Sequence, residues 1–356
     1  MDLREQRFGI EIEMTGLTRA RAAEVIAEYF NSDADYVGGS YDAYYIKDNM
    51  GRDWKVVSDA SIVCQRKIEG RKLSAPRDYA VEMVSPICEY DDIEKIQEIV
   101  RELRKAGAFA NSSVGIHIHI DAAPFTAEKI CNLVNITASK EDMIYKALQV
   151  ESRREERYCK KIDPQFLERI NKYKPKTLDS LKTIWYNGGD GSRQHYHESR
   201  YHCLNLHSVF QKGTIEFRAF NSGDAGGGGI IHAGKIKAYI QFCMAVTAQA
   251  YNQRYASPKK TVSENEKYTF RGWLLRLGLI GDEFKTARAH LLNHLEGNIA
   301  WKDPAQAIAQ KERLRQKREQ QNMAEHQETE QTNEELPSEE TQQIAEENTH
   351  GFSISM

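Results

Sequence analysis

Residues 8–14 read Phe8-Gly9-Ile10-Glu11-Ile12-Glu13-Met14, an alternation of apolar and acidic side chains. Successive side chains of a β-strand point to opposite faces, so this period of two predicts a strand. Glu11 and Glu13 then share one face, and Ile10, Ile12 and Met14 take the other. The stretch therefore predicts a strand that packs on one side and presents carboxylates on the other.

Three later stretches repeat this pattern. They read AVEMVS at residues 80–85, GIHIHI at residues 115–120 and GTIEFR at residues 213–218. Each offers an apolar face together with a polar face that carries, in chain order, Glu82, His117 with His119, and Glu216 with Arg218. We expect these four strands to form the centre of the fold.

Helical spacing of apolar residues separates the strands. It predicts helices over residues 18–31, 91–106, 126–158 (with Thr126 as N-cap) and 230–251. Residues 202–207 and 214–220 read as a hairpin, and the Gly-rich fingerprint of a doubly wound sheet is missing. The sequence thus predicts an α+β fold with a mainly antiparallel sheet and flanking helices.

The chain divides by composition into three parts. We expect a catalytic domain over residues 1–255, a helical extension over residues 256–305, and a charged helix end with an acidic tail over residues 306–356. From Glu319 onward there are ten Glu and no Lys or Arg, which predicts disorder because little apolar surface can be buried.

Bulk properties limit the partners and the location. A net charge of −3 gives no general attraction to nucleic acid or to an anionic membrane, and no apolar run approaches a spanning helix. The N-terminus has no signal-peptide region, and the six cysteines are scattered singly. We expect a cytoplasmic protein that binds neither nucleic acid nor membrane; the sequence leaves room for a homo-oligomer.

The polar faces are unusual as a set. A solvent-facing sheet would also alternate, but such faces normally mix Lys, Thr, Ser and Glu, whereas these carry four Glu, two His and one Arg. Two carboxylates at ~4 Å repel by about 4 kcal/mol at an effective dielectric near 20, so the gathered carboxylates need cations. Oxygen-rich sites with few imidazoles suit Mg²⁺ or Mn²⁺ better than zinc.

The order of the motifs resembles that of the amidoligase family, which comprises ATP-dependent carboxylate–amine ligases related to glutamine synthetase and glutamate–cysteine ligase. The likeness runs from about residue 7 to residue 250. Besides the four strands it includes two elements, WKVVSDAS at residues 54–61 and Asn205-Leu206 before the last strand.

The resemblance implies a curved, glutamine-synthetase-like sheet whose concave face holds several Mg²⁺ or Mn²⁺ ions and ATP. It implies metal ligation by five residues, Glu11, Glu13, Glu82, His117 and Glu216. It places Arg218, His119 and Ser85 against the cofactor and Arg218, Glu216 and Asp59 in catalysis. Asp59 and Ser61 match the Asp-x-Ser element of the family.

The resemblance also implies the chemistry. ATP would phosphorylate a small-molecule or peptide carboxylate, and an amine would displace phosphate from the acyl phosphate to form an amide. Two alternatives stay open on the residues alone: a two-metal-dependent hydrolase or nuclease using the same cluster, and a non-catalytic interaction protein with an acidic tail.

Overall fold

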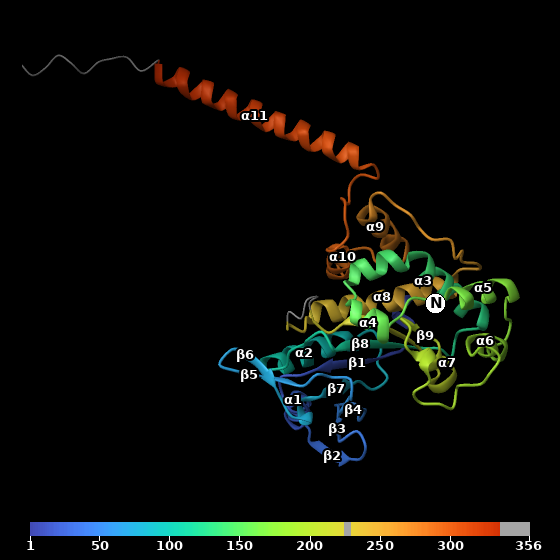
Figure 1. Ribbon diagram of the computed structural model, residues 1–356. Helices are drawn as coiled ribbons and strands as arrows, with labels where there is room; N and C mark the ends of the chain where they lie inside the picture. The colour runs from blue at the N-terminus through green and yellow to red at the C-terminus, as the bar shows by residue number, and fades with distance from the viewer. Residues whose placement is uncertain (224–228, 335–356) are drawn as a thin grey trace, which may run out of the picture. The chain divides into compact units, whose positions relative to one another are not determined.

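One eight-stranded sheet organises the computed structural model, which describes residues 1–223 and 229–334. Every pairing in it is antiparallel, and the strand order is β2-β3-β4-β7-β1-β8-β10-β9 (Figure 1). The strands are β1 (Phe8–Met14), β2 (Ala34–Gly38), β3 (Ala43–Lys47), β4 (Asp53–Val57), β7 (Val81–Val84), β8 (Gly115–Asp121), β9 (Leu204–Asn205) and β10 (Thr214–Asn221). The predicted large antiparallel sheet is confirmed.

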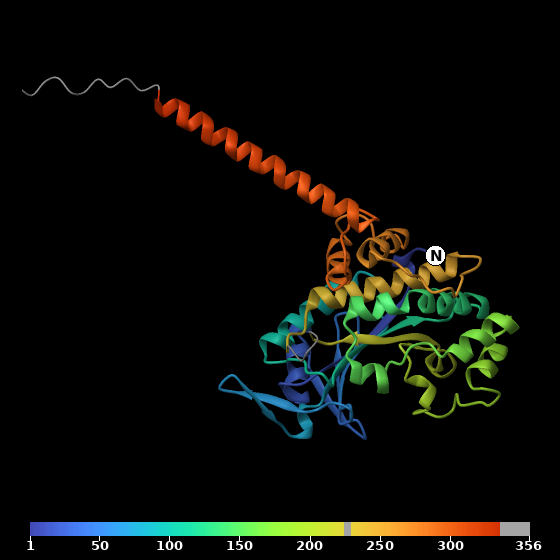
Figure 2. The same cartoon turned by 45° about the horizontal axis from the view of Figure 1, so that its top comes forward.

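A second, two-stranded sheet consists of a hairpin of β5 (Gln65–Ile68) and β6 (Arg71–Ser74). Figure 2 shows it projecting beside the body of the sheet. Its first residue is joined to the end of β1, because the Gln65 carbonyl accepts hydrogen bonds from the Thr15 hydroxyl and the Gly16 amide.

The α-helices are α1 (Arg19–Phe30), α2 (Asp92–Lys105), α3 (Ala127–Leu148), α4 (Ser152–Arg157), α5 (Pro164–Tyr173), α6 (Leu178–Trp185), α7 (His207–Lys212), α8 (Ala233–Asn252), α9 (Glu266–Arg276), α10 (Lys285–Leu292) and α11 (Pro304–Glu334). Short 3₁₀ turns occur at η1 (Leu3–Glu5), η2 (Arg77–Tyr79) and η3 (Glu198–Arg200). Flanking helices are therefore confirmed together with the sheet.

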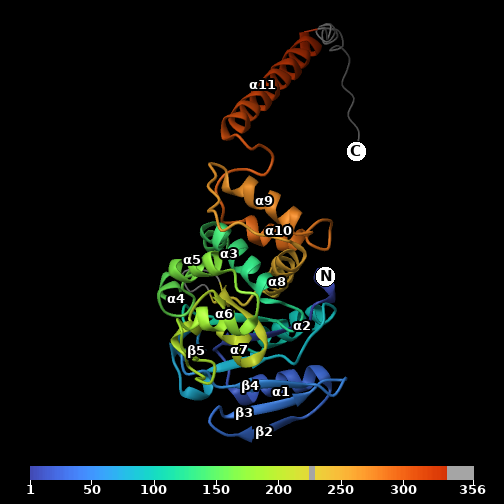
Figure 3. The same ribbon diagram turned by 90° about the vertical axis from the view of Figure 1, so that its right-hand side faces the viewer.

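The apolar side chains of the central strands form the core. Ile10, Ile12 and Met14 of β1 are at most 1% exposed, and so are the three Ile residues of β8. A fully buried Ile stabilises a fold by roughly 1.5–3 kcal/mol, which fixes the polar residues between them on the other face. Contacts of α1, α2, α3 and α8 with one another and with the strands cover this core (Figures 1 and 3).

Two predicted elements differ in detail. The helix that begins at its predicted N-cap Thr126 ends at Leu148, where Gln149 adopts the left-handed conformation, and α4 starts anew at Ser152. The predicted hairpin of residues 202–207 and 214–220 is present as the β9–β10 pair, with the short helix α7 inserted between its strands.

The chain separates into two compact units, residues 1–299 and 300–356. Helices α9 and α10 belong to the first unit, where α10 contacts α8 and α3. Helix α11 reaches Glu334, so residues 319–334 are helical where we predicted disorder; Glu, Gln, Ala and Met in this stretch are good helix formers. Residues 335–356 of the predicted tail lie outside the described residues.

The three-part functional division stays a prediction. In residues 1–223 and 229–334, no helix combines the length and apolar character that crossing a bilayer requires.

Candidate functional site

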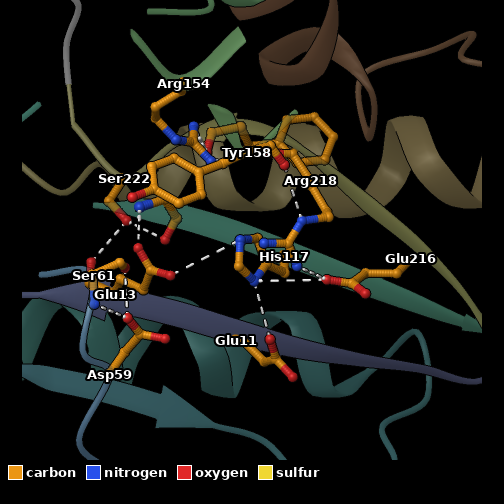
Figure 4. A network of polar contacts seen from close by, with 12 residues as sticks. Glu11, Glu13, Asp59, Ser61, His117, Arg154, Tyr158, Glu216, Arg218 and Ser222 are labelled. Atoms are coloured by element: carbon orange, nitrogen blue, oxygen red, sulfur yellow. Dashed lines mark hydrogen bonds and ion pairs between the residues drawn. The ribbon is translucent and has the colours of Figure 1, made fainter. Parts of the chain in front are cut away.

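Strand register brings the predicted side chains together. Glu11 on β1 lies opposite His117 on β8, and Glu13 on β1 lies opposite Glu82 on β7. Glu216 on β10 lies opposite His119 on β8. Since directly paired residues project from the same face of a sheet, all of these side chains meet on one face. Figure 4 shows four of them, Glu11, Glu13, His117 and Glu216.

Four of these residues, Glu11, His117, His119 and Glu216, form what we call the histidine cluster. His117 Nδ1 lies 3.0 Å from Glu11 Oε2, and His119 Nε2 lies 3.3 Å from Glu11 Oε1. Glu216 Oε1 is 3.8 Å from His117 Nδ1 and 3.9 Å from His119 Nε2. The two imidazoles thus stand between two buried or half-buried carboxylates.

Built-in cations neutralise the histidine cluster. The Arg218 guanidinium forms an ion pair with Glu216, and its Nε–H donates to the Tyr158 carbonyl at 3.2 Å. Burial alone would raise the pKa of Glu216, but the charges of Arg218 and the histidines lower it to about 2. At Glu11, too, burial would raise the pKa, but the neighbouring His119 and His117 outweigh this effect and hold the pKa well below its usual range.

Glu13, Asp59 and Glu82 form a second group, the carboxylate cluster. Asp59 comes from the loop after β4, and its Oδ1 accepts a hydrogen bond from the Ser61 amide at 2.6 Å. Burial and the neighbouring charge of Asp59 raise the pKa of Glu13 to about 7. Burial, followed by the charges of Glu11 and Glu13, raises the pKa of Glu82 well above its usual value.

The side chains fit divalent cations. Three sets offer ligand atoms that all lie within 4.8 Å of one another: Glu11, Glu82 and His117; Glu11, His119 and Glu216; and Glu13, Asp59 and Glu82. Burial lowers the pKa of His117 to about 4, which leaves its ring neutral and able to donate a lone pair. The buried His119 Nε2 lies 3.3 Å from Glu11 Oε1 without the alignment of a hydrogen bond, and within the described residues it has no other hydrogen-bond partner, which suits a ligand atom.

A cavity of about 290 Å³ adjoins the histidine cluster. Its lining includes Glu11, Ser85, His119, Lys212 and Thr214. The Ser85 hydroxyl already donates to the Pro86 carbonyl at 2.8 Å and accepts from the Ile10 amide at 2.9 Å. A contact of Ser85 or His119 with a cofactor stays a prediction, and the cavity gives both residues access to one.

Three residues of the site were not predicted to have a role. Asn205 Nδ2 donates to Glu216 Oε2 at 2.5 Å, and Lys212 Nζ lies 3.7 Å from Glu11 Oε1. Arg154 is buried beside β10. Asn205 stood in a quoted motif, whereas Arg154 is one of several charged residues on α4 and Lys212 is the last residue of the short helix α7, and no local pattern distinguishes either of them.

Fold and site together define an α+β protein with a carboxylate- and histidine-lined centre on one face of an antiparallel sheet. Residues 4–247 match the family model described as "Putative amidoligase enzyme". The chain belongs to this amidoligase family, as the order of its motifs predicted, and the family description is that of a ligase.

Other comparisons add little. No curated protein matches the chain. Among solved structures, the crystal structure of a bifunctional glutathione synthetase from Pasteurella multocida is similar, with 12% identity and a TM-score of 0.41 over 82% of this chain. The chain spans about half, 47%, of that protein's length.

Proposed function

We propose that this protein is an ATP-dependent carboxylate–amine ligase that forms an amide through an acyl phosphate at a site with several Mg²⁺ ions. The convergence of the histidine and carboxylate clusters on one sheet face carries the proposal. Membership of the amidoligase family supports the reaction class. Three overlapping sets of ligand atoms support more than one cation.

The chain's own residues would divide the work. Glu11, Glu13, Glu82, His117 and Glu216 would hold the cations, with Mn²⁺ as a substitute for Mg²⁺. When bound, the cations neutralise phosphate charge during phosphoryl transfer. Arg218, with its fork of N–H donors, would hold the transferred phosphoryl group.

The proposed reaction has two steps. A carboxylate oxygen of the first substrate attacks the γ-phosphorus of ATP, the bond to the bridging oxygen breaks, and ADP leaves. The amine nitrogen then attacks the carbonyl carbon of the acyl phosphate, inorganic phosphate leaves, and the nitrogen loses a proton. We place Asp59, held by Ser61 at the carboxylate cluster, among the catalytic residues.

The remaining assignments follow from this function. The cavity bordered by Ser85 and His119 would take the nucleotide, and small-molecule or peptide substrates would supply the carboxylate and the amine. We propose that the sheet is the counterpart of a glutamine-synthetase-like core. All six cysteines are free thiols, which supports a reducing compartment such as the cytoplasm.

The test is ADP release from the full chain with Mg²⁺ and ATP, screened over carboxylates and amines. We expect release that needs one of each, and its loss in Glu216→Gln with an unchanged circular dichroism spectrum. Glu156→Gln, an exposed change on α4, is the matched control and should keep full activity.

Three results would contradict the proposal. One is full ATP turnover in Glu216→Gln, which would mean that the site lies elsewhere. Another is metal-dependent cleavage of nucleic acid without ATP, which would favour the nuclease alternative. The third is calorimetry that detects no Mg²⁺–ATP binding by the wild type, which would exclude an ATP-dependent ligase.

A further inference from the structure

Strand β10 contains a bulge at the residue that matters most for the proposed phosphoryl transfer. Its register with β8 advances from Phe217 opposite Ile118 to Phe220 opposite Ile116, which is three residues on β10 against two on β8. Arg218 is therefore one of the two residues within the bulge. A bulge interrupts the ladder of hydrogen bonds and re-aims a side chain, and bulges are common beside active sites.

Arg154 on α4 binds the carbonyl groups of this bulge. Its Nη1 donates to the Phe220 carbonyl at 2.6 Å and to Asn221 Oδ1 at 2.9 Å, and its Nη2 donates to the Arg218 carbonyl at 2.9 Å. Arg154 is only 3% exposed. In residues 1–223 and 229–334 no carboxylate forms an ion pair with it, which is unusual because buried arginines are normally paired.

Helix α4 contacts Arg218 at a second point. The carbonyl of Tyr158, the residue that caps α4, accepts the hydrogen bond from Arg218 Nε. One short helix thus holds the backbone of Arg218 through the Arg154 guanidinium and its side chain through the Tyr158 carbonyl (Figure 4). These two contacts hold the Arg218 backbone and its Nε, while the terminal Nη1 pairs with Glu216.

Gly115 supplies the space for this arrangement. A Cβ at Gly115 would lie 2.2 Å from Arg154 Nη2 and 2.7 Å from its Cζ, and Gly115 does not adopt a positive φ. The glycine is therefore required by the guanidinium and not by the backbone. Gly115 also touches the carboxylate cluster, since its amide donates to Glu13 Oε2 at 2.7 Å.

We propose that Arg154 is a positioning residue that holds the β10 bulge and so directs the Arg218 guanidinium toward the transferred phosphoryl group. The inference rests on the proposed function for what Arg218 does. It goes beyond that function by assigning the orientation of Arg218 to a residue that has no contact of its own with Glu11 or Glu216.

The first experiment is independent of any substrate. The Arg218 Nε–H resonance, recorded in protein with ¹⁵N-labelled arginine and assigned by its loss in Arg218→Lys, reports the environment of the guanidinium. We expect it to shift or broaden in Arg154→Ala and in Gly115→Ala, and to stay unchanged in Arg157→Ala, an exposed change on the same helix.

The second experiment uses ADP release. Arg154→Ala should lower kcat about 100-fold, as expected when a reacting group is misplaced, while Mn²⁺ affinity changes little. Arg154→Lys should be nearly as poor, because one ammonium cannot span three acceptors. Guanidinium chloride, well below unfolding concentrations, should restore activity to Arg154→Ala and leave Gly115→Ala unchanged.

A double-mutant cycle completes the test. Gly115→Ala displaces the Arg154 guanidinium, so it should add almost nothing in the Arg154→Ala background, where there is room for the methyl group. An Arg218 resonance that is identical in wild type and Arg154→Ala would overturn the inference, as would additive effects of the two variants. A wild type without ADP release would instead contradict the proposed function, while the resonance would still decide the role of Arg154.

Discussion

The two halves of the site solve the same electrostatic problem differently. The histidine cluster contains its own positive charge, because Arg218 pairs with Glu216 and Lys212 lies near Glu11. In the carboxylate cluster, no Lys or Arg of residues 1–223 and 229–334 forms an ion pair with Glu13, Asp59 or Glu82. The pKa values follow this difference: they are lowered at Glu11 and Glu216 and raised at Glu13 and Glu82.

The comparison indicates which half depends on added cations. Carboxylates that are neutralised by the chain remain ionised without metal, whereas the raised pKa values of Glu13 and Glu82 favour their protonation until a cation arrives. We therefore expect the histidine cluster to be assembled in the metal-free protein. The carboxylate cluster should be the part that Mg²⁺ or Mn²⁺ stabilises most.

Breaking the internal ion pair should have the largest effect. Arg218→Ala leaves Glu216 buried without its cation, and removing one partner of a buried pair costs about 3 kcal/mol or more. We expect the free energy of unfolding to fall by that amount in urea denaturation at neutral pH with EDTA present.

The matched control removes both charges. In the double variant Glu216→Gln/Arg218→Met no unpaired charge stays behind. Its free energy of unfolding should therefore fall by less than roughly half of the decrease in Arg218→Ala. Equal losses in the two proteins would show that Arg218 contributes through packing and not through its charge.

Ionisation of the carboxylate cluster should make the metal-free protein less stable as the pH rises. The folded-state pKa of Glu13, about 7, lies above its ordinary value of 4.5. Its stabilising contribution is therefore fully present below about pH 4.5 and is lost as the pH rises through about 7. With EDTA present, this group alone accounts for about 3 kcal/mol at most between pH 4.5 and 8.

Thermal denaturation across this pH range measures the slope. Glu13→Gln and Glu82→Gln should remove the part of the stability that falls with rising pH and raise the metal-free melting temperature at pH 8, whereas exposed Glu156→Gln should leave both unchanged. Saturating Mn²⁺ should flatten the wild-type slope as well. Because the lowered pKa of His117 adds stability with rising pH in both proteins, the contribution of Glu13 is the difference between the wild-type and Glu13→Gln slopes, and identical slopes would contradict our description of this cluster.

The smallest effect is expected at the edge of the histidine cluster. Lys212 is about half-exposed and lies 3.7 Å from Glu11, so solvent screens most of its charge. Lys212→Met should tighten Mn²⁺ binding in calorimetry by about two- to threefold, because a competing cation is removed. Weaker binding would mean that Lys212 organises Glu11 instead of competing for it.

The faces of the strands were predictable from the sequence, but their register was not. Alternation in residues 8–14 and 115–120 is a local property, and it placed Glu11, Glu13, His117 and His119 on polar faces. That Glu11 lies opposite His117 depends on pairing between strands more than 100 residues apart in sequence. Local patterns carry no information on such pairings.

Features set by tertiary contacts escaped prediction for the same reason. The bulge at Arg218 has no glycine or other local signal, and it depends on Arg154, which reads as one charge among several on α4. The break between α3 and α4 at Gln149 also lacks Gly or Pro, so helical periodicity continued through it. Both places have a partner that is distant in sequence: Arg154 binds the bulge, and the Gln149 carbonyl accepts a hydrogen bond from Asn221 Nδ2 at 2.7 Å.

The central place of β1 has a consequence for how the protein is made. Strand β1, which precedes the other strands of the sheet in sequence, is flanked by β7 and β8, and Glu216 and Arg218 arrive only with β10. Pairings of such long sequence separation form slowly, because much chain must be ordered before they are gained. A nascent chain that stops before residue 214 would expose β8 as an open edge, which is a template for aggregation. We expect this protein to need chaperone protection during synthesis.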